Sequence, residues 1–172
     1  MKTTKNKTII LGTAHLKSTP GKCSPDGNFF EYKYSREVCK VIKVILEDLG
    51  YKVMIDIEDD DLKVSQSQEL CLRCKIVNDL QKTYKNCIYI SIHVNAAGSD
   101  GKWHNATGWS AYTSVGITSA DELANCLYES AKKNLTGKKL RTDYADKDPD
   151  LESNFYVLKH TECPAVLTEN FF

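Results

Sequence analysis

Short apolar runs bounded by polar turns alternate along the chain with segments in which apolar residues recur every three or four positions. The short runs predict strands at 7–14, 51–57, 87–93, 108–113, 155–158 and 165–168. The periodic segments predict helices at 30–49, 67–80 and 119–135. Strands that alternate with helices predict a single α/β domain with a mostly parallel, twisted sheet of about six strands and helices on both faces.

Polar segments separate these elements. The loop at 16–28 is rich in Pro and Gly, and the segment 137–153 is predicted to be a long polar loop. Ser119, with Glu122 three residues later, is predicted to cap the third helix.

Composition excludes some classes of protein. The chain has 172 residues, and 23 Lys and Arg balance 23 Asp and Glu, so it lacks the basic surplus of a nucleic-acid binder. No window is long enough to insert in a membrane. The apolar run after the basic start covers only 8–11, which is too short for a signal peptide. We therefore expect a soluble chain, acting as a monomer, with no nucleic-acid partner.

The chain has seven cysteines, an odd number that argues against a disulfide framework and for folding in a reducing compartment. Cys71 and Cys74 form a CxxC within a predicted helix. No second pair stands at zinc spacing, so packed or surface thiols are favoured over a metal site.

Three polar residues stand at the ends of predicted strands, and a fourth begins a helix. His15, His93 and Glu169 follow strands, and Glu31 opens the helix after the first loop. Two histidines and a carboxylate are a common catalytic zinc set, and a second carboxylate is then needed to move a proton. Spacing alone leaves open the alternative of structural histidines and solvated carboxylates.

Five sequence segments, taken in their order along the chain, add to the evidence from these four residues. The segments GTAH (12–15), EYKYSREVCKVIKVILEDLGYKV (31–53), LCLRCKIVND (70–79), YISIHVNAA (89–97) and FYVLKHTECPAVLTENFF (155–172) span most of the chain. In this order they resemble the motifs of the type 3 zinc-dependent N-acetylmuramoyl-L-alanine amidases of cell-wall hydrolases and phage endolysins. The resemblance implies that His15, Glu31 and His93 bind Zn²⁺ and that Glu169 is the catalytic acid and base.

The implied reaction is hydrolysis of the amide between the lactyl group of N-acetylmuramic acid and L-alanine in peptidoglycan, leading to cell-wall lysis. There are two alternatives: a zinc peptidase that acts on the stem peptide, and a non-catalytic wall-binding module.

Residues 1–172 are expected to form the catalytic domain. Family members usually continue past the final glutamate, so either a C-terminal helix or wall-binding region follows or this end is unusual. Such an enzyme is released at lysis or exported by a signal not present here.

Departures from the family pattern affect the surroundings of the site. HLKSTPG replaces the usual glycines after the first histidine, and Ser35 stands near a usual asparagine.

Other polar residues are assigned weaker roles. His104 and His160 are expected at the surface, and Arg73 and Asn78 are expected to fix their helix. Trp103, Trp109 and Tyr112 are candidates to line a sugar or peptide groove, with the core as the alternative for Trp109 and Tyr112. Lys139 and Arg141 are candidates to meet stem-peptide carboxylates.

Overall fold

The computed structural model describes residues 6–172. Its strands are β1 (Thr8–Thr13), β2 (Lys52–Ile55), β3 (Cys87–His93), β4 (Trp109–Thr113), β5 (Leu151–Glu152) and β6 (Ala165–Asn170). Its helices are α1 (Glu31–Asp48), α2 (Gln66–Tyr84), α3 (Ser119–Asn134) and α4 (Tyr156–His160). The strand order in the sheet is β2-β1-β3-β6-β4-β5, and of these pairings β4 with β6 is antiparallel. The predicted α/β domain with a mostly parallel sheet is confirmed.

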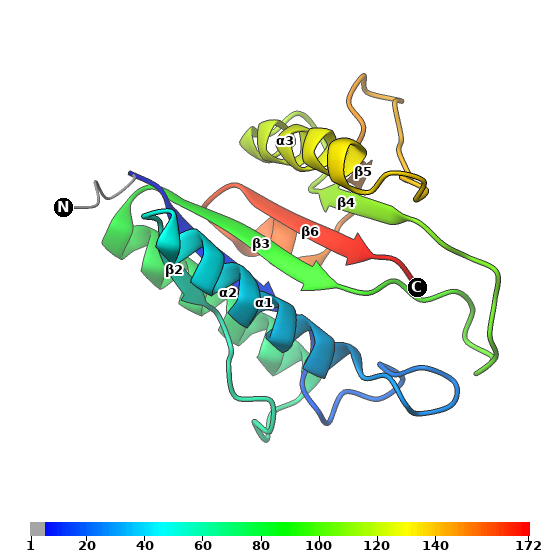
Figure 1. Cartoon of the computed structure of the whole chain (residues 1–172). Helices are drawn as coiled ribbons and strands as arrows, with labels where there is room; N and C mark the ends of the chain where they lie inside the picture. Colours follow the sequence, from blue (N-terminus) through cyan, green and yellow to red (C-terminus); the bar gives the residue numbers. More distant parts are fainter. Residues whose placement is uncertain (1–5) are drawn as a thin grey trace.

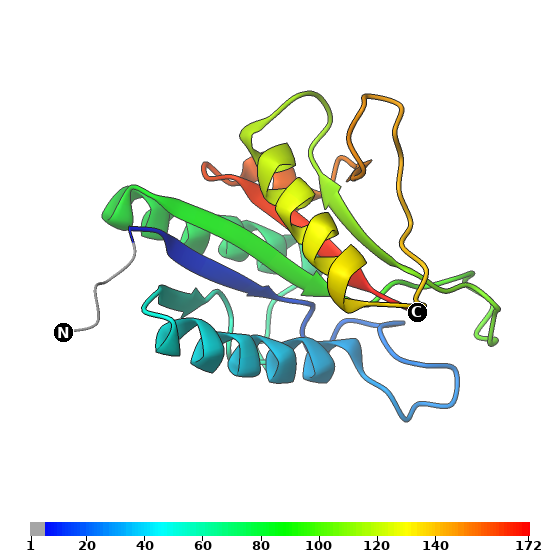
Figure 2. The ribbon, with the colours of Figure 1, turned by 45° about the horizontal axis from the view of Figure 1, so that its top comes forward.

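Helices cover both faces of the sheet because successive side chains of a strand point to opposite sides. Ile9 and Leu11 of β1 pack with the apolar side of α1, whereas Ile10, between them, packs with α2 and α4. Val166 of β6 joins the cluster beneath α3. Figure 2 shows α1 and α3 on the near side of the sheet and α2 behind it.

The segment 155–158 was predicted to be a strand, and this prediction is wrong: Phe155 is the N-cap of the short helix α4, and the other three residues form its first turn. A four-residue apolar run does not distinguish a buried strand from a buried helical turn. Here Val157 and Leu158 are buried in the core between α2 and the sheet. The Asn78 side chain of α2 donates to the carbonyl of His160 at 2.9 Å and accepts from the Glu162 N–H at 2.8 Å. Asn78 thus joins α2 to the end of α4.

Two smaller predictions also need correction. The segment 137–153 is not entirely loop, because β5 extends the sheet beside β4. Thr118, one residue before the predicted cap, begins α3 and forms a capping box with Asp121.

All seven cysteines are free thiols, as expected, and Cys71 and Cys74 lie in α2. Among the described residues, no helix is both long enough and apolar enough to cross a membrane.

The three central strands run parallel, so their carboxyl ends meet at one edge of the sheet. The arrowheads of β3 and β6 point to the same end in Figure 1. His15 follows β1, His93 ends β3, and Glu169 lies near the end of β6. The fold therefore brings the predicted residues to one edge.

Candidate metal and catalytic centre

His15, Glu31 and His93 form a compact cluster at this edge. One potential ligand atom from each lies within 4.8 Å of the other two. Glu31 Oε2 lies 3.4 Å from His15 Nε2, and Glu31 Oε1 lies 3.0 Å from His93 Nδ1. The two imidazole rings stand edge to face, with 5.1 Å between their centroids. Within residues 6–172, this is the one group of three or more such side chains that could hold a metal ion.

The electrostatics of the cluster suit metal ligands. Burial, together with the neighbouring His93, lowers the pKa of His15 to about 3, so this imidazole is neutral at physiological pH. Burial opposes ionisation of Glu31, but the hydrogen bonds from His93 and from the Val94 N–H lower its pKa below the ordinary value. A neutral imidazole and an ionised carboxylate are the forms that bind metal ions.

Glu169 lies beside His93, its register partner on the neighbouring strand. Its Oε2 atom is buried and has no hydrogen-bond partner. Burial, followed by the negative charge of Glu31, raises the pKa of Glu169 to about 8, although Lys22 and Arg141 act in the opposite direction. A carboxyl group in this state holds or releases a proton near neutral pH, as a general acid and base must.

The chain segments that present the two histidines are tied together by a buried serine. Ser35, on α1, accepts a hydrogen bond from the Ala14 N–H at 2.7 Å and donates one to the Ile92 carbonyl at 2.7 Å. Each contact lies one residue before a histidine. Ser35 therefore links the exits of β1 and β3.

His15 itself has a backbone φ of 49°, which is uncommon for a residue other than glycine. Its carbonyl accepts hydrogen bonds from Arg36 at 2.9 Å and from Arg73 at 3.5 Å. Arg36 also donates to the carbonyl of Ala14 at 3.2 Å. These two buried guanidinium groups hold the backbone in the conformation that directs the imidazole to the cluster.

Arg73 belongs to a buried polar network beneath His15. Its guanidinium pairs with Asp56 at 2.6 Å and with Glu69 at 2.8 Å, and Tyr89 donates to Asp56 at 2.9 Å. A Cβ atom at Gly12 would lie 2.3 Å from the Tyr89 hydroxyl, so a side chain at this position would displace the ring. Arg73 was expected to have a structural role, and these contacts identify Asp56 and Glu69 as its partners.

The remaining polar predictions divide between surface and core. His104 and His160 are exposed, as expected. Trp103 is 68% exposed, whereas Trp109 is buried against Tyr128. Tyr112, Lys139 and Arg141 line a cleft together with Asn95, which follows His93 by two residues.

The comparison with known sequences identifies the family. A sequence profile described as N-acetylmuramoyl-L-alanine amidase matches residues 9–172. The chain belongs to this family. No curated protein sequence gives a significant match.

Solved structures of amidases have the same fold. AmiC2 of Nostoc punctiforme, an N-acetylmuramoyl-L-alanine amidase, is 19% identical with a TM-score of 0.74, over 99% of this chain and 82% of that one. The amidase of Clostridium difficile 630 is 23% identical with a TM-score of 0.74, over 96% and 80%. The catalytic domain of the CD27L endolysin, which targets the same species, is 19% identical with a TM-score of 0.67, over 96% and 81%. At these identities the likeness establishes the fold alone.

Sequence reasoning named all four residues that meet at this edge but missed the residues that position them. Arg36, Asp56 and Tyr89 stand within predicted elements, where their spacing gives no sign of partners far away in sequence. The one available signal was a charged residue inside an otherwise apolar stretch, as in MIDI at 54–57.

Proposed function

We propose that this chain is a zinc-dependent amidase that hydrolyses the bond between the lactyl group of N-acetylmuramic acid and L-alanine in peptidoglycan. His15, Glu31 and His93 are the proposed ligands, and Glu169 is the proposed acid and base. The observation that supports this most strongly is the meeting of these four side chains at one edge of the sheet, in a chain that matches the amidase family from residue 9 to 172.

The chemistry of the donor set favours zinc. Two imidazole nitrogens with one carboxylate suit Zn²⁺, whereas Mg²⁺ and Ca²⁺ prefer oxygen ligands alone. The close approach of Glu31 to both histidines leaves the cluster compact enough for one ion to reach all three. When bound, Zn²⁺ supplies a Lewis acid that makes a water molecule acidic near neutral pH.

Glu169 then moves the proton. Its Oε2 atom is shielded from bulk water, and its raised pKa makes the carboxylate a stronger base toward the attacking water. The same group returns the proton to the L-alanine nitrogen as the amide bond breaks, so that the amine leaves neutral. One carboxyl group thus serves both halves of the reaction.

The proposed biological role is lysis of the cell wall, which makes peptidoglycan the partner of the protein.

The test is mass analysis of muropeptides after purified peptidoglycan is digested with zinc-loaded protein, with and without a chelator. The proposal predicts free stem peptides that begin at L-alanine, and none when metal is removed. New amino ends within the stem would identify a peptidase. Undigested wall that retains bound protein would identify a wall-binding module.

A further inference from the structure

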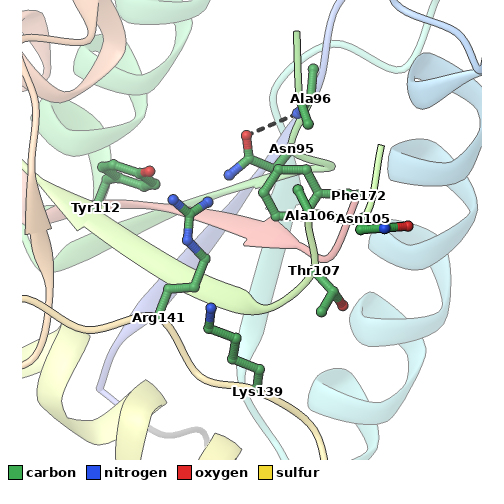
Figure 3. A pocket seen from close by; sticks show the side chains of 10 residues that line it. Asn95, Ala96, Asn105, Ala106, Thr107, Tyr112, Lys139, Arg141 and Phe172 are labelled. Atoms are coloured by element: carbon green, nitrogen blue, oxygen red, sulfur yellow. Dashed lines mark hydrogen bonds between the residues drawn. The ribbon is translucent and has the colours of Figure 1, made fainter. Parts of the chain in front are cut away.

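A cleft of about 420 Å³ is lined by residues that follow His93 and Glu169 closely in the chain. Its lining residues come from the segments after β3 and after β6, from the segment before β4 and from β4 itself, and from the loop after α3: Asn95, Ala96, Ala97, Asn105, Ala106, Thr107, Tyr112, Lys139, Arg141 and Phe172. Figure 3 shows Lys139 and Arg141 on one side of this cleft, with Asn95 and Phe172 across from them. The sequence made these two residues candidates to meet stem-peptide carboxylates, and the reaction proposed above gives neither of them a step.

The side chains that line the cleft carry a net positive charge. Lys139 and Arg141 are the charged side chains in the lining, and none of the others is Asp or Glu. Throughout the described part of the chain, neither cation has a carboxylate within ion-pair distance. The lining also offers amide and hydroxyl groups from Asn95, Asn105 and Thr107. An anion that enters the cleft would meet two unpaired cations and neutral hydrogen-bond donors.

The backbone of Arg141 is held by hydrogen bonds, and its side chain packs against two neighbouring residues. Its N–H donates to the Trp109 carbonyl at 2.8 Å, and its own carbonyl accepts from the Tyr128 hydroxyl at 2.6 Å. Its aliphatic stem crosses Gly108 so closely that a Cβ atom there would lie 2.7 Å from Arg141 Cγ. Its guanidinium lies over the ring of Phe172, 5.3 Å from the centroid. An arginine whose stem and guanidinium are restricted by such packing loses less conformational entropy when it binds a carboxylate.

The cleft lies at a distance from Glu169 that a short stretch of stem peptide can span. Asn95 follows His93 by two residues, Phe172 follows Glu169 by three, and the Asn95 N–H donates to the Phe171 carbonyl at 2.9 Å. Residues 139–141 run beside β4, which pairs with β6, so they lie two strand spacings, about 10 Å, from the strand of Glu169. An extended peptide advances about 3.5 Å per residue. The second residue after the scissile amide is therefore within reach of a long side chain from this segment.

We propose that Arg141, assisted by Lys139, binds the free α-carboxylate of D-glutamate, the second residue of the stem peptide, and so selects stems in which this group is not amidated. This inference rests on the proposed function. D-Glutamate continues the stem through its γ-carboxyl, which leaves its α-carboxylate as the nearest anion to the scissile bond. A planar guanidinium binds a carboxylate through two parallel hydrogen bonds, whereas the neutral amide of isoglutamine offers one acceptor oxygen and repels through its own N–H donors.

The test compares two substrates on one enzyme. N-Acetylmuramoyl-L-Ala-D-Glu and N-acetylmuramoyl-L-Ala-D-isoglutamine are hydrolysed by the zinc-loaded wild type, by Arg141→Met and Lys139→Met, and by the control Lys138→Met. Lys138 is a neighbouring basic residue that does not line the cleft. Methionine retains an unbranched apolar stem over Gly108 and Phe172. Because both substrates are measured on the same sample, partial unfolding cancels in their ratio of kcat/KM.

We expect the wild type and Lys138→Met to prefer the free carboxylate by about 10- to 100-fold, the range for a hydrogen bond to a charged group. Arg141→Met should bring the ratio close to one, mainly by slowing the glutamate substrate, and Lys139→Met should reduce it less. A wild-type ratio near one, or an unchanged ratio in Arg141→Met, overturns the inference while leaving the proposed amidase activity standing. If the wild type cleaves neither substrate, the proposed function itself fails.

Inhibition by inorganic phosphate, measured at constant ionic strength, distinguishes a cleft that binds phosphate groups from one that binds the stem carboxylate. The inference predicts weak inhibition by phosphate, and a dipeptide L-Ala-D-Glu that inhibits the wild type far more than Arg141→Met. Should phosphate inhibition depend on Arg141 while the ratio for the two substrates does not, the cleft binds phosphate groups and the stem-carboxylate assignment is wrong.

Discussion

The buried ion pair between Asp56 and Arg73 gives a quantitative test of how the site is held. In Asp56→Asn the side chain keeps its shape and loses its charge. Asp56 Oδ1 accepts from the Thr13 N–H at 2.9 Å, and Oδ2 accepts from Arg73 at 2.6 Å and from Tyr89 at 2.9 Å. An asparagine can retain the contact to Thr13, but its NH₂ group would then face two donors where a carboxylate oxygen had stood.

The expected cost is large because both partners are inaccessible to water: the Arg73 side chain is 3% exposed and the Asp56 side chain is 0% exposed. Removing one partner of a buried pair typically costs about 3–5 kcal/mol. In a domain of this size each kcal/mol lowers Tm by about 2–4 °C, so Asp56→Asn should lower Tm by about 6–20 °C.

The matched control is the same substitution at Asp79. This residue pairs with Lys75 on the surface of α2, where the side chains of Lys75 and Asp79 are 71% and 54% exposed. Exposed pairs contribute about 0–1 kcal/mol. Urea unfolding at equal pH and salt gives the free energy of unfolding for both variants, and equal m-values would show that the same unfolding transition is compared.

The reasoning is refuted if Asp56→Asn loses no more stability than Asp79→Asn. In that case the network beneath His15 would not anchor the exit of β1, and the positioning role given to Arg73 would have no energetic basis.

Two further predictions concern the metal and the pH. His93→Ala should lose the bound zinc, and elemental analysis that finds one zinc per folded chain in this variant would remove His93 from the ligand set. Burial and the nearby Asp148 raise the pKa of Asp150 from 3.8 to about 7. The folded state then binds the proton more tightly than the unfolded state, so this group's favourable contribution to stability is present at low pH and is lost as the pH rises from about 4 to about 7. Asp150→Asn should therefore be more stable than the wild type at pH 8 by a margin that shrinks at pH 4, and urea titrations with a constant margin would contradict this.

The sequence was informative where a residue's role follows from its place along a strand. His15, His93 and Glu169 could be assigned to one edge because parallel strands bring their carboxyl ends together, and Glu31 because it opens the helix after the first of them. The placement of these residues follows from the order of strands and helices along the chain, and the spacing of apolar residues reveals that order.

The sequence was uninformative where the outcome depends on tertiary packing. The run at 155–158 has residues that favour strands, yet Val157 and Leu158 are buried as a helical turn beside α2. The pairing of Asp56 with Arg73 and Tyr89 joins β2, α2 and β3, and the cleft of Arg141 depends on Gly108 lying beneath its stem. No local pattern encodes such contacts.

Glu169→Gln tests the central claim most directly, because glutamine keeps the size of the side chain but cannot take up a proton from water. The measurement is the release of L-alanine amino ends from purified peptidoglycan, together with the zinc content of the same sample. Glu162→Gln, an exposed position on the preceding turn, is the control. We predict one zinc per chain in all three proteins, with release by the wild type and the control and at least about 100-fold slower release by Glu169→Gln. Wild-type release by zinc-loaded Glu169→Gln would contradict the account.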